Sequence, residues 1–148
     1  DVPYCLMRGT ALAEGIGEKL TELPAPPKAS ILVAKPPIMV STKEVYQSLK
    51  ADELSSHPDI DGMIEALKQG SLQGITDRMV TVEQFPVIAQ IKDFMKEHGA
   101  MNALMSGSGP TVFGIYKEEQ EALAAEKALR EMGLAKQIKV TQFYNGER

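Results

Sequence analysis

Several residue types that often carry structure or chemistry are scarce in this 148-residue sequence, which contains one cysteine, two histidines and no tryptophan. Because Cys5 has no second cysteine to pair with, an internal disulfide and a multi-cysteine zinc site are excluded, and a reducing cytoplasm is the expected location. His57 and His98 lie far apart, so we expect no metal site. The longest apolar runs, such as residues 31–34, are far shorter than the roughly 20 residues that cross a bilayer, so we expect no membrane span.

Positive charge is also in short supply. The sequence has 16 basic and 20 acidic residues, for a net charge of −4. Such a chain lacks the basic field that gathers nucleic-acid phosphates, so a nucleic-acid partner is disfavoured. The composition that remains, 43% hydrophobic and 24% charged, is typical of a soluble globular protein. The sequence opens at Asp1-Val2-Pro3 without methionine, and from this we expect a piece of a longer protein.

Glycine and proline divide the first third of the chain. Residues 4–23 contain three glycines and show no helical period, which predicts strands joined by tight turns, with Cys5 as a small buried side chain. After a proline-rich spacer, the continuous apolar run 29–34 predicts a buried strand. The sequence Ser41-Thr42-Lys43-Glu44 matches a capping box and predicts a short helix that ends at about residue 50.

The remaining two thirds predict three more helices and three more strands. Helical spacing of apolar residues predicts helices over 59–70, 86–99 and 118–132, whereas residues 71–83 are ambiguous. Short apolar segments predict strands over 101–105, 111–116 and 138–144. After residue 28 this order is that of an α+β, ferredoxin-like, split β-α-β-β-α-β sandwich, with helices on one face of an antiparallel sheet.

The segment between the strands of the predicted hairpin carries the strongest chemical signal. Residues 105–111, Met-Ser-Gly-Ser-Gly-Pro-Thr, place two glycines and two serines where the chain must turn. Glycine allows a positive φ, so successive backbone amides can face an anion such as phosphate. The segment lacks the Gly-Lys-Ser/Thr ending of a Walker A loop, and an ordinary hairpin turn can have the same composition. Taken alone, the segment leaves both interpretations open.

A wider set of motifs resembles one enzyme family. Residues 105–113 resemble the third conserved motif of the GHMP kinases, the family of galactose, homoserine, mevalonate and phosphomevalonate kinases. Further matches lie at residues 1–5, 8–11, 15–20, 35–37, 41–46 and 57–59. The similarity continues to the last predicted strand and so covers the whole chain. These matches imply a kinase of non-mevalonate isoprenoid synthesis, which transfers the γ-phosphate of ATP to the 2-hydroxyl of a cytidine-diphosphate methylerythritol.

The resemblance also implies roles for particular residues. Asp1 matches the family's catalytic aspartate, which can orient or accept the hydroxyl proton. Tyr46 matches an aromatic ring that lies against cytosine, and Thr42 and Ile16 match positions that line the cytidine pocket. Without the resemblance, Asp1 would be an aspartate at a frayed end, and Tyr46 and Ile16 would be ordinary packing residues. The phosphate and active-site loop then consists of Ser106, Gly107, Ser108, Gly109 and Thr111.

Two elements of the family are missing from the sequence. The glycine- and serine-rich ATP loop does not occur, and no residue matches the catalytic lysine near the start of the family's chains. The chain therefore resembles the carboxy-terminal half: residues 1–28 are a strand and turn segment left from the N-terminal domain or the domain junction, and residues 29–148 are the GHMP kinase C-terminal domain. We expect the missing N-terminal domain to bind most of the ATP and Mg²⁺. The piece alone should fold but have no kinase turnover.

The sequence leaves two other functions open. Another GHMP kinase, of the homoserine kinase type, shares the Gly-Ser-Gly-Pro turn. From a different class, ferredoxin-like sandwiches also serve as non-catalytic modules that bind small molecules.

Overall fold

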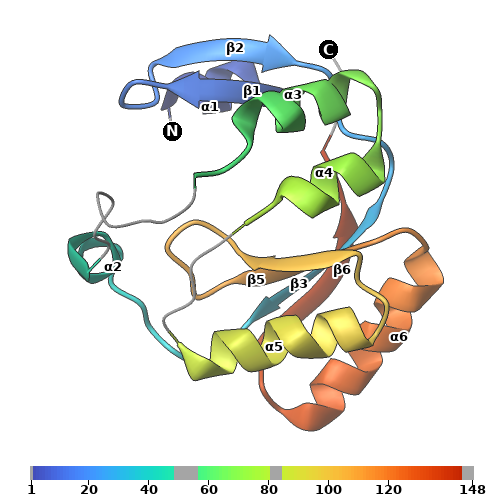
Figure 1. The fold of residues 1–148 in the computed structure, drawn as a ribbon. Coiled ribbons are helices and arrows are strands. Elements are labelled where there is room, and N and C mark those ends of the chain that lie inside the picture. The colour runs from blue at the N-terminus through green and yellow to red at the C-terminus, as the bar shows by residue number, and fades with distance from the viewer. Residues whose placement is uncertain (1, 49–56, 81–84, 145–148) are drawn as a thin grey trace.

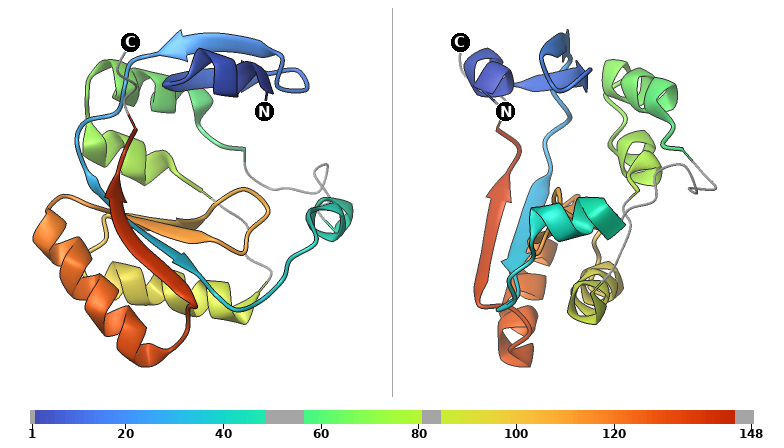
Figure 2. Two further views of the ribbon diagram at one scale, coloured as in Figure 1. Left: turned by 180° about the vertical axis from the view of Figure 1, so that it is seen from behind. Right: turned by 90° about the vertical axis from the view of Figure 1, so that its left-hand side faces the viewer.

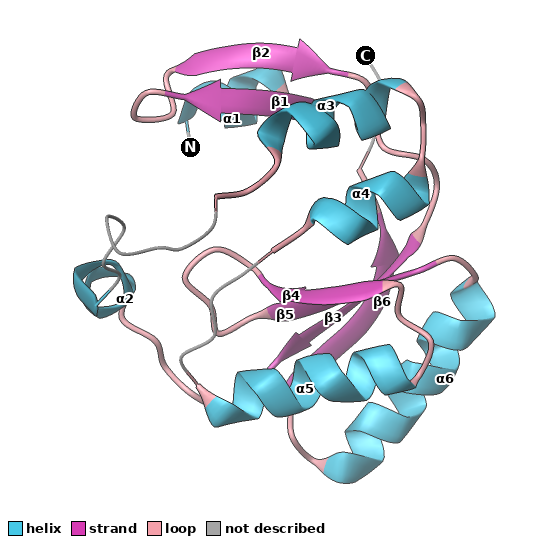
Figure 3. Cartoon of the chain, viewed as in Figure 1, coloured by secondary structure: helices cyan, strands magenta, loops and turns pink. Residues whose placement is uncertain are grey.

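The computed structural model describes residues 2–48, 57–80 and 85–144, which contain both helices and strands (Figures 1 and 3). The helices are α1 (Val2–Met7), α2 (Thr42–Ser48), α3 (Ile60–Lys68), α4 (Leu72–Arg78), α5 (Pro86–Glu97) and α6 (Glu119–Met132). The strands are β1 (Thr10–Glu14), β2 (Lys19–Leu23), β3 (Ser30–Lys35), β4 (Asn102–Met105), β5 (Val112–Tyr116) and β6 (Gln137–Gln142).

The last four strands form one antiparallel sheet in the order β4-β5-β3-β6. The first strand of the unit, β3, thus lies between the third and the fourth, with Ala34 opposite both Val112 of β5 and Ile138 of β6. This is the order of a ferredoxin-like sheet, so the predicted α+β fold is confirmed. The predicted hairpin is present as β4 and β5.

One face of this sheet carries the main apolar core. Side chains alternate along a strand, so Leu32 and Ala34 of β3 face this core while Val33 faces away from it. Helices α5 and α6 cover the face with buried side chains, which are Ile88, Ile91, Phe94, Met95, Ala122, Ala125 and Leu129. The prediction of two helices on one face is therefore confirmed.

A smaller layer is made of α3 and α4, which lie beside the N-terminal hairpin (Figures 1 and 2). Its apolar cluster includes Leu67 and Ile75, with Leu23 of β2 packed against them. The layer is tied to the sheet through the side chain of Asn102, whose Nδ2 donates to the carbonyl of Thr76 at 2.7 Å and to that of Met79 at 3.1 Å.

The N-terminal segment differs in part from its prediction. The expected hairpin is present as β1 and β2, with Thr10 opposite Leu23. However, Val2–Met7 form a helix rather than a strand, and Cys5 on this helix is exposed rather than buried. Both predictions are wrong for the same reason. None of the six residues of α1 is buried, and a helix without a buried face leaves no apolar period in the sequence.

Two local features decide where the shorter helices begin. The ambiguous stretch 71–83 contains α4, which starts where Ser71 Oγ accepts a hydrogen bond from the Gly74 amide at 3.1 Å; residues 81–84 lie outside the described part. At the predicted capping box, Ser41 Oγ accepts from the Glu44 amide at 3.4 Å, and α2 begins at the next residue.

Within the described ranges, no helix combines the length and the apolar character that a membrane crossing requires.

Candidate active site

Strand order brings two distant segments to the same end of the sheet. Strand β3 ends at Lys35 and β5 begins at Val112, and these two antiparallel strands are neighbours. The chain that leaves β3 toward α2 therefore starts beside the β4–β5 loop, residues 106–111, which leads into β5 (Figure 1). The chain that leads to the predicted helix with Thr42 and Tyr46 and the predicted phosphate loop thus begin at the same end of the sheet.

A hydrogen bond joins these two segments directly. Thr42, the first residue of α2, places its Oγ1 2.9 Å from Oγ of Ser108, although 66 positions separate the residues in the sequence. Either hydroxyl can be the donor. The structure therefore brings together one residue of the predicted cytidine pocket and one of the predicted phosphate loop.

The β4–β5 loop is a tight turn held by its own backbone. The Ser106 amide donates to the Thr111 carbonyl at 2.8 Å, and the Gly109 amide donates to the Ser106 carbonyl at 2.9 Å. Gly107 and Gly109 both have positive φ values, +56° and +85°, as the sequence predicts. A Cβ at Gly109 would also come within 2.6 Å of Met105 Sδ, so a side chain at this position would be strained by the positive φ and would displace Met105.

The turn leaves two amides available. Among the backbone hydrogen bonds of the described residues, none uses the amide of Gly107 or that of Ser108. Ser106 and Gly107 are exposed, and Ser108 is half-buried. Two unpaired donors on an exposed loop of left-handed glycines are compatible with the close approach of an anion.

Thr111, the last residue of the predicted loop, has different surroundings. Its side chain lines a hollow of about 480 Å³ together with four basic residues, which are Lys35, Arg130, Lys136 and Lys139. Among the described residues, no other predicted site residue lines this hollow. Thr111 therefore closes the turn that holds Ser108 and also borders a basic hollow that Thr42 and Ser108 do not line.

The other predicted site residues are less closely placed. Ile16 lies at the tip of the β1–β2 hairpin, where it is 97% exposed between Gly15 and Gly17, and its amide donates to Glu18 Oε2 at 2.7 Å. No hydrogen bond among the described residues connects Ile16 to Thr42 or Ser108. Tyr46 lies on α2, four residues after Thr42, but its side chain is outside the described part of the structure, as is the whole of Asp1.

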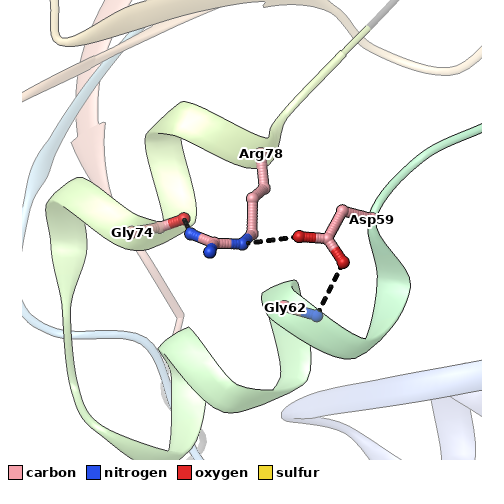
Figure 4. Close-up of polar contacts among 4 residues, drawn as sticks. All are labelled: Asp59, Gly62, Gly74 and Arg78. Atoms are coloured by element: carbon pink, nitrogen blue, oxygen red, sulfur yellow. Dashed lines mark hydrogen bonds and ion pairs between the residues drawn. The ribbon is translucent and has the colours of Figure 1, made fainter.

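The aspartate of the 57–59 motif has a structural task. Asp59 caps α3, with Oδ1 accepting from the Gly62 amide at 2.9 Å, and its Oδ2 accepts from Arg78 Nε at 3.0 Å (Figure 4). Arg78 Nη1 also donates to the Gly74 carbonyl at 2.9 Å, so one guanidinium links α3 to α4. The Gly62 hydrogen bond, and then Arg78, hold the pKa of the Asp59 carboxyl below its ordinary value. No sequence pattern indicates that Arg78 is the partner of Asp59, because 19 positions separate the two residues.

This fold and loop define a class of protein. The family model described as the C-terminal domain of the GHMP kinases matches residues 47–135, which is more than half of the sequence, and the chain belongs to this family. The resemblance drawn from the motifs is therefore confirmed at the level of the family.

Individual members of the family differ in how similar they are to this chain. A protein of Lachnospira eligens named 4-diphosphocytidyl-2-C-methyl-D-erythritol kinase is 55% identical over 97% of this chain and 52% of its own length. The crystal structure of a 4-(cytidine 5'-diphospho)-2C-methyl-D-erythritol kinase matches with a TM-score of 0.74 and 29% identity, over 99% of this chain and 54% of that one.

A homoserine kinase from Cytophaga hutchinsonii has the same TM-score of 0.74 at 20% identity, over 97% of this chain and 50% of that one. At that identity the likeness shows the fold alone. The chain spans about half the length of each of these relatives.

Proposed function

We propose that this chain is the C-terminal part of an ATP-dependent kinase that phosphorylates the 2-hydroxyl of 4-diphosphocytidyl-2-C-methylerythritol in isoprenoid precursor synthesis. The observation that carries the proposal is the 55% identity, over 97% of the chain, to the Lachnospira eligens protein of that name. The homoserine kinase of equal TM-score is only 20% identical, so the shared fold does not favour homoserine as the acceptor. The cysteine content supports a cytoplasmic location for the enzyme.

The proposed roles follow the motif matches. Asp1 accepts the proton of the acceptor hydroxyl, and Ile16, Thr42 and Tyr46 contact the cytidine part of the acceptor. The 2.9 Å contact between Thr42 and Ser108 supports an acceptor held beside the glycine-rich loop. Phosphoryl transfer depends mainly on keeping the acceptor oxygen in line with the phosphate and on stabilising the charge, and such a shared site serves the first requirement.

This chain would provide only a minor share of the contacts to ATP and Mg²⁺. The β4–β5 loop suits a phosphate oxygen, because its positive-φ glycines permit close approach and the amides of Gly107 and Ser108 have no backbone partner among the described residues. In the described ranges, no group of three His, Cys, Asp or Glu side chains is placed to hold a metal ion. We therefore assign most of the nucleotide and metal contacts to an N-terminal domain, the proposed partner of this chain. Bound ATP would supply the transferred phosphate, and Mg²⁺ would neutralise part of its negative charge.

The test is a comparison of acceptors with the longer protein that contains this chain. ATP is supplied with the cytidine compound, homoserine or mevalonate, and the phosphorylated product is followed by ³¹P NMR. We expect transfer to the cytidine compound, and Asp1→Asn should lower kcat by a factor of about 10² to 10⁴. Transfer to homoserine alone, or to none of the three, would contradict the proposal.

The 148-residue chain provides the matched control. It should give an α+β circular dichroism spectrum and a cooperative unfolding transition but no phosphorylated product. Measurable ATP-dependent turnover by this chain would show that the nucleotide site is not located mainly in another domain.

A further inference from the structure

The described side chains of helix α2 are mostly exposed. The described side chains of this helix are exposed except for the half-buried Val45. The helix stands apart from the sheet and from α5 and α6 in Figure 1 and in the left view of Figure 2. Packing of the described side chains therefore does little to fix the position of Thr42, and a directional bond at the start of the helix has a correspondingly large influence.

The partner of Thr42, in contrast, belongs to a well-fixed part of the molecule. Ser108 lies inside the turn closed by the Gly109–Ser106 and Ser106–Thr111 backbone hydrogen bonds. The next residue, Gly109, fits closely against Met105, which is only 9% exposed. The Ser108 hydroxyl is therefore a fixed point to which the start of α2 is bonded.

A hydrogen bond between two hydroxyls can run in either direction, and the direction decides which hydrogen stays free. Each hydroxyl has one hydrogen to donate and can accept two hydrogen bonds. When Ser108 donates to Thr42, the Thr42 hydrogen stays free for an acceptor atom of a ligand. The contact can thus set both the position and the hydrogen-bonding direction of the Thr42 side chain.

We propose that Ser108 is a positioning residue that acts through Thr42 on binding of the cytidine-bearing acceptor. The inference rests on the proposed function, because it takes Thr42 as a contact of that acceptor. It assigns to Ser108 an effect different from that of a direct phosphate contact. A serine that binds the phosphates of ATP affects the KM for ATP, whereas a serine that positions Thr42 affects the KM for the acceptor.

The experiment measures both KM values and kcat in the longer protein for Ser108→Ala, Thr42→Val and the double variant. Loss of one hydrogen bond predicts that Ser108→Ala raises the acceptor KM about 5- to 10-fold, with kcat and the KM for ATP within about 2-fold of wild type. The double variant should be no worse than Thr42→Val alone, because Ser108 then has nothing to position. Ser108→Thr keeps the hydroxyl and should restore the acceptor KM to within about 3-fold.

Gln47→Ala provides the control, since Gln47 is an exposed residue on the same helix without a proposed contact, and it should leave all three constants unchanged. Circular dichroism checks that each variant is folded, and Ser108→Thr still decides the question if Ser108→Ala is not. An active wild type in which Ser108→Ala shifts the KM for ATP, or in which the two substitutions add, overturns the inference and leaves the proposed function standing. A wild type that does not phosphorylate the cytidine compound overturns both.

Discussion

The glycine-rich turn permits a sharp test of how tightly the candidate site is built. Gly109 combines a φ of +85° with a virtual Cβ only 2.6 Å from Met105 Sδ, whereas Gly107 has a φ of +56° and nothing within 4 Å of its virtual Cβ. The two positions lie two residues apart in the same turn. Substitution by alanine at each therefore separates the backbone term from the packing term.

The expected losses follow from these two terms. A left-handed conformation costs a residue with a Cβ roughly 1–2 kcal/mol, and this applies to both positions. Overpacking of a close-fitting site adds about 1–3 kcal/mol, and this applies to Gly109 alone. Gly107→Ala should therefore lose about 1 kcal/mol of unfolding free energy, and Gly109→Ala about 3 kcal/mol.

Urea unfolding of the 148-residue chain, followed by circular dichroism, measures the difference. With an m-value of about 2 kcal/mol/M, the midpoint should fall by about 0.5 M for Gly107→Ala and about 1.5 M for Gly109→Ala. In a Met105→Ala background the Sδ atom is gone, and Gly109→Ala should then cost no more than Gly107→Ala. Equal shifts for the two single variants, or no relief from Met105→Ala, would refute the role given to this contact.

Three further predictions concern the scaffold. Leu129→Ala, at a fully buried position of α6, should lower the unfolding free energy by about 2–4 kcal/mol in urea, whereas Leu123→Ala, 48% exposed on the same helix, should lose less than about 1 kcal/mol; similar losses would contradict the assigned core. Tyr116→Phe removes a 3.3 Å bond to a Met95 carbonyl that still accepts from the Ala100 amide, so thermal unfolding should show a loss below about 1 kcal/mol, and a loss above about 2 kcal/mol would contradict this account. Because the folded-state pKa of Asp59 is lowered, its carboxylate stabilises the fold above its unfolded pKa of about 4 and less as the pH falls below it; the stability gap between wild type and Asp59→Asn should therefore narrow on acidification, and a gap independent of pH would argue against the Gly62 and Arg78 bonds.

The parts of the fold that could be predicted are those whose sequence period is imposed by a large buried face. Helix α5 buries Ile88, Ile91 and Met95 at the spacing of a helical face, and α6 does the same with Ala122, Ala125 and Leu129. Both helices are long enough for this period to repeat. The order of the remaining strands and helices after residue 28, α4 excepted, follows from the pattern alone.

The short helices α1 and α4 show no such apolar period in the sequence. Helix α4 buries only Ile75 and Thr76, and α1 buries none of its six residues, so neither repeats an apolar position. Their stability comes from features that a period search does not detect, such as the Ser71 cap and the Asn102 side chain that bonds to the end of α4. The exposure of Cys5 has the same origin, because the residue type predicts burial but does not indicate the exposed helix that carries Cys5.

The meeting of Thr42 and Ser108 was predictable to the level of segments and no further. Once β3 and β5 are neighbours in an antiparallel ferredoxin-like sheet, the last residues of β3 and the first residues of β5 must lie at the same end of the sheet. The register, with Ala34 opposite Val112, confirms this arrangement. The hydrogen bond itself depends on where α2 starts and on the turn around Ser108, and two hydroxyl residues carry no sequence signal for pairing. Both segments start from this strand pair, so the positions of β3 and β5 decide where the chain toward α2 and the β4–β5 loop begin. The Thr42–Ser108 hydrogen bond then joins the two segments directly, at the point where the register of the sheet no longer determines their positions.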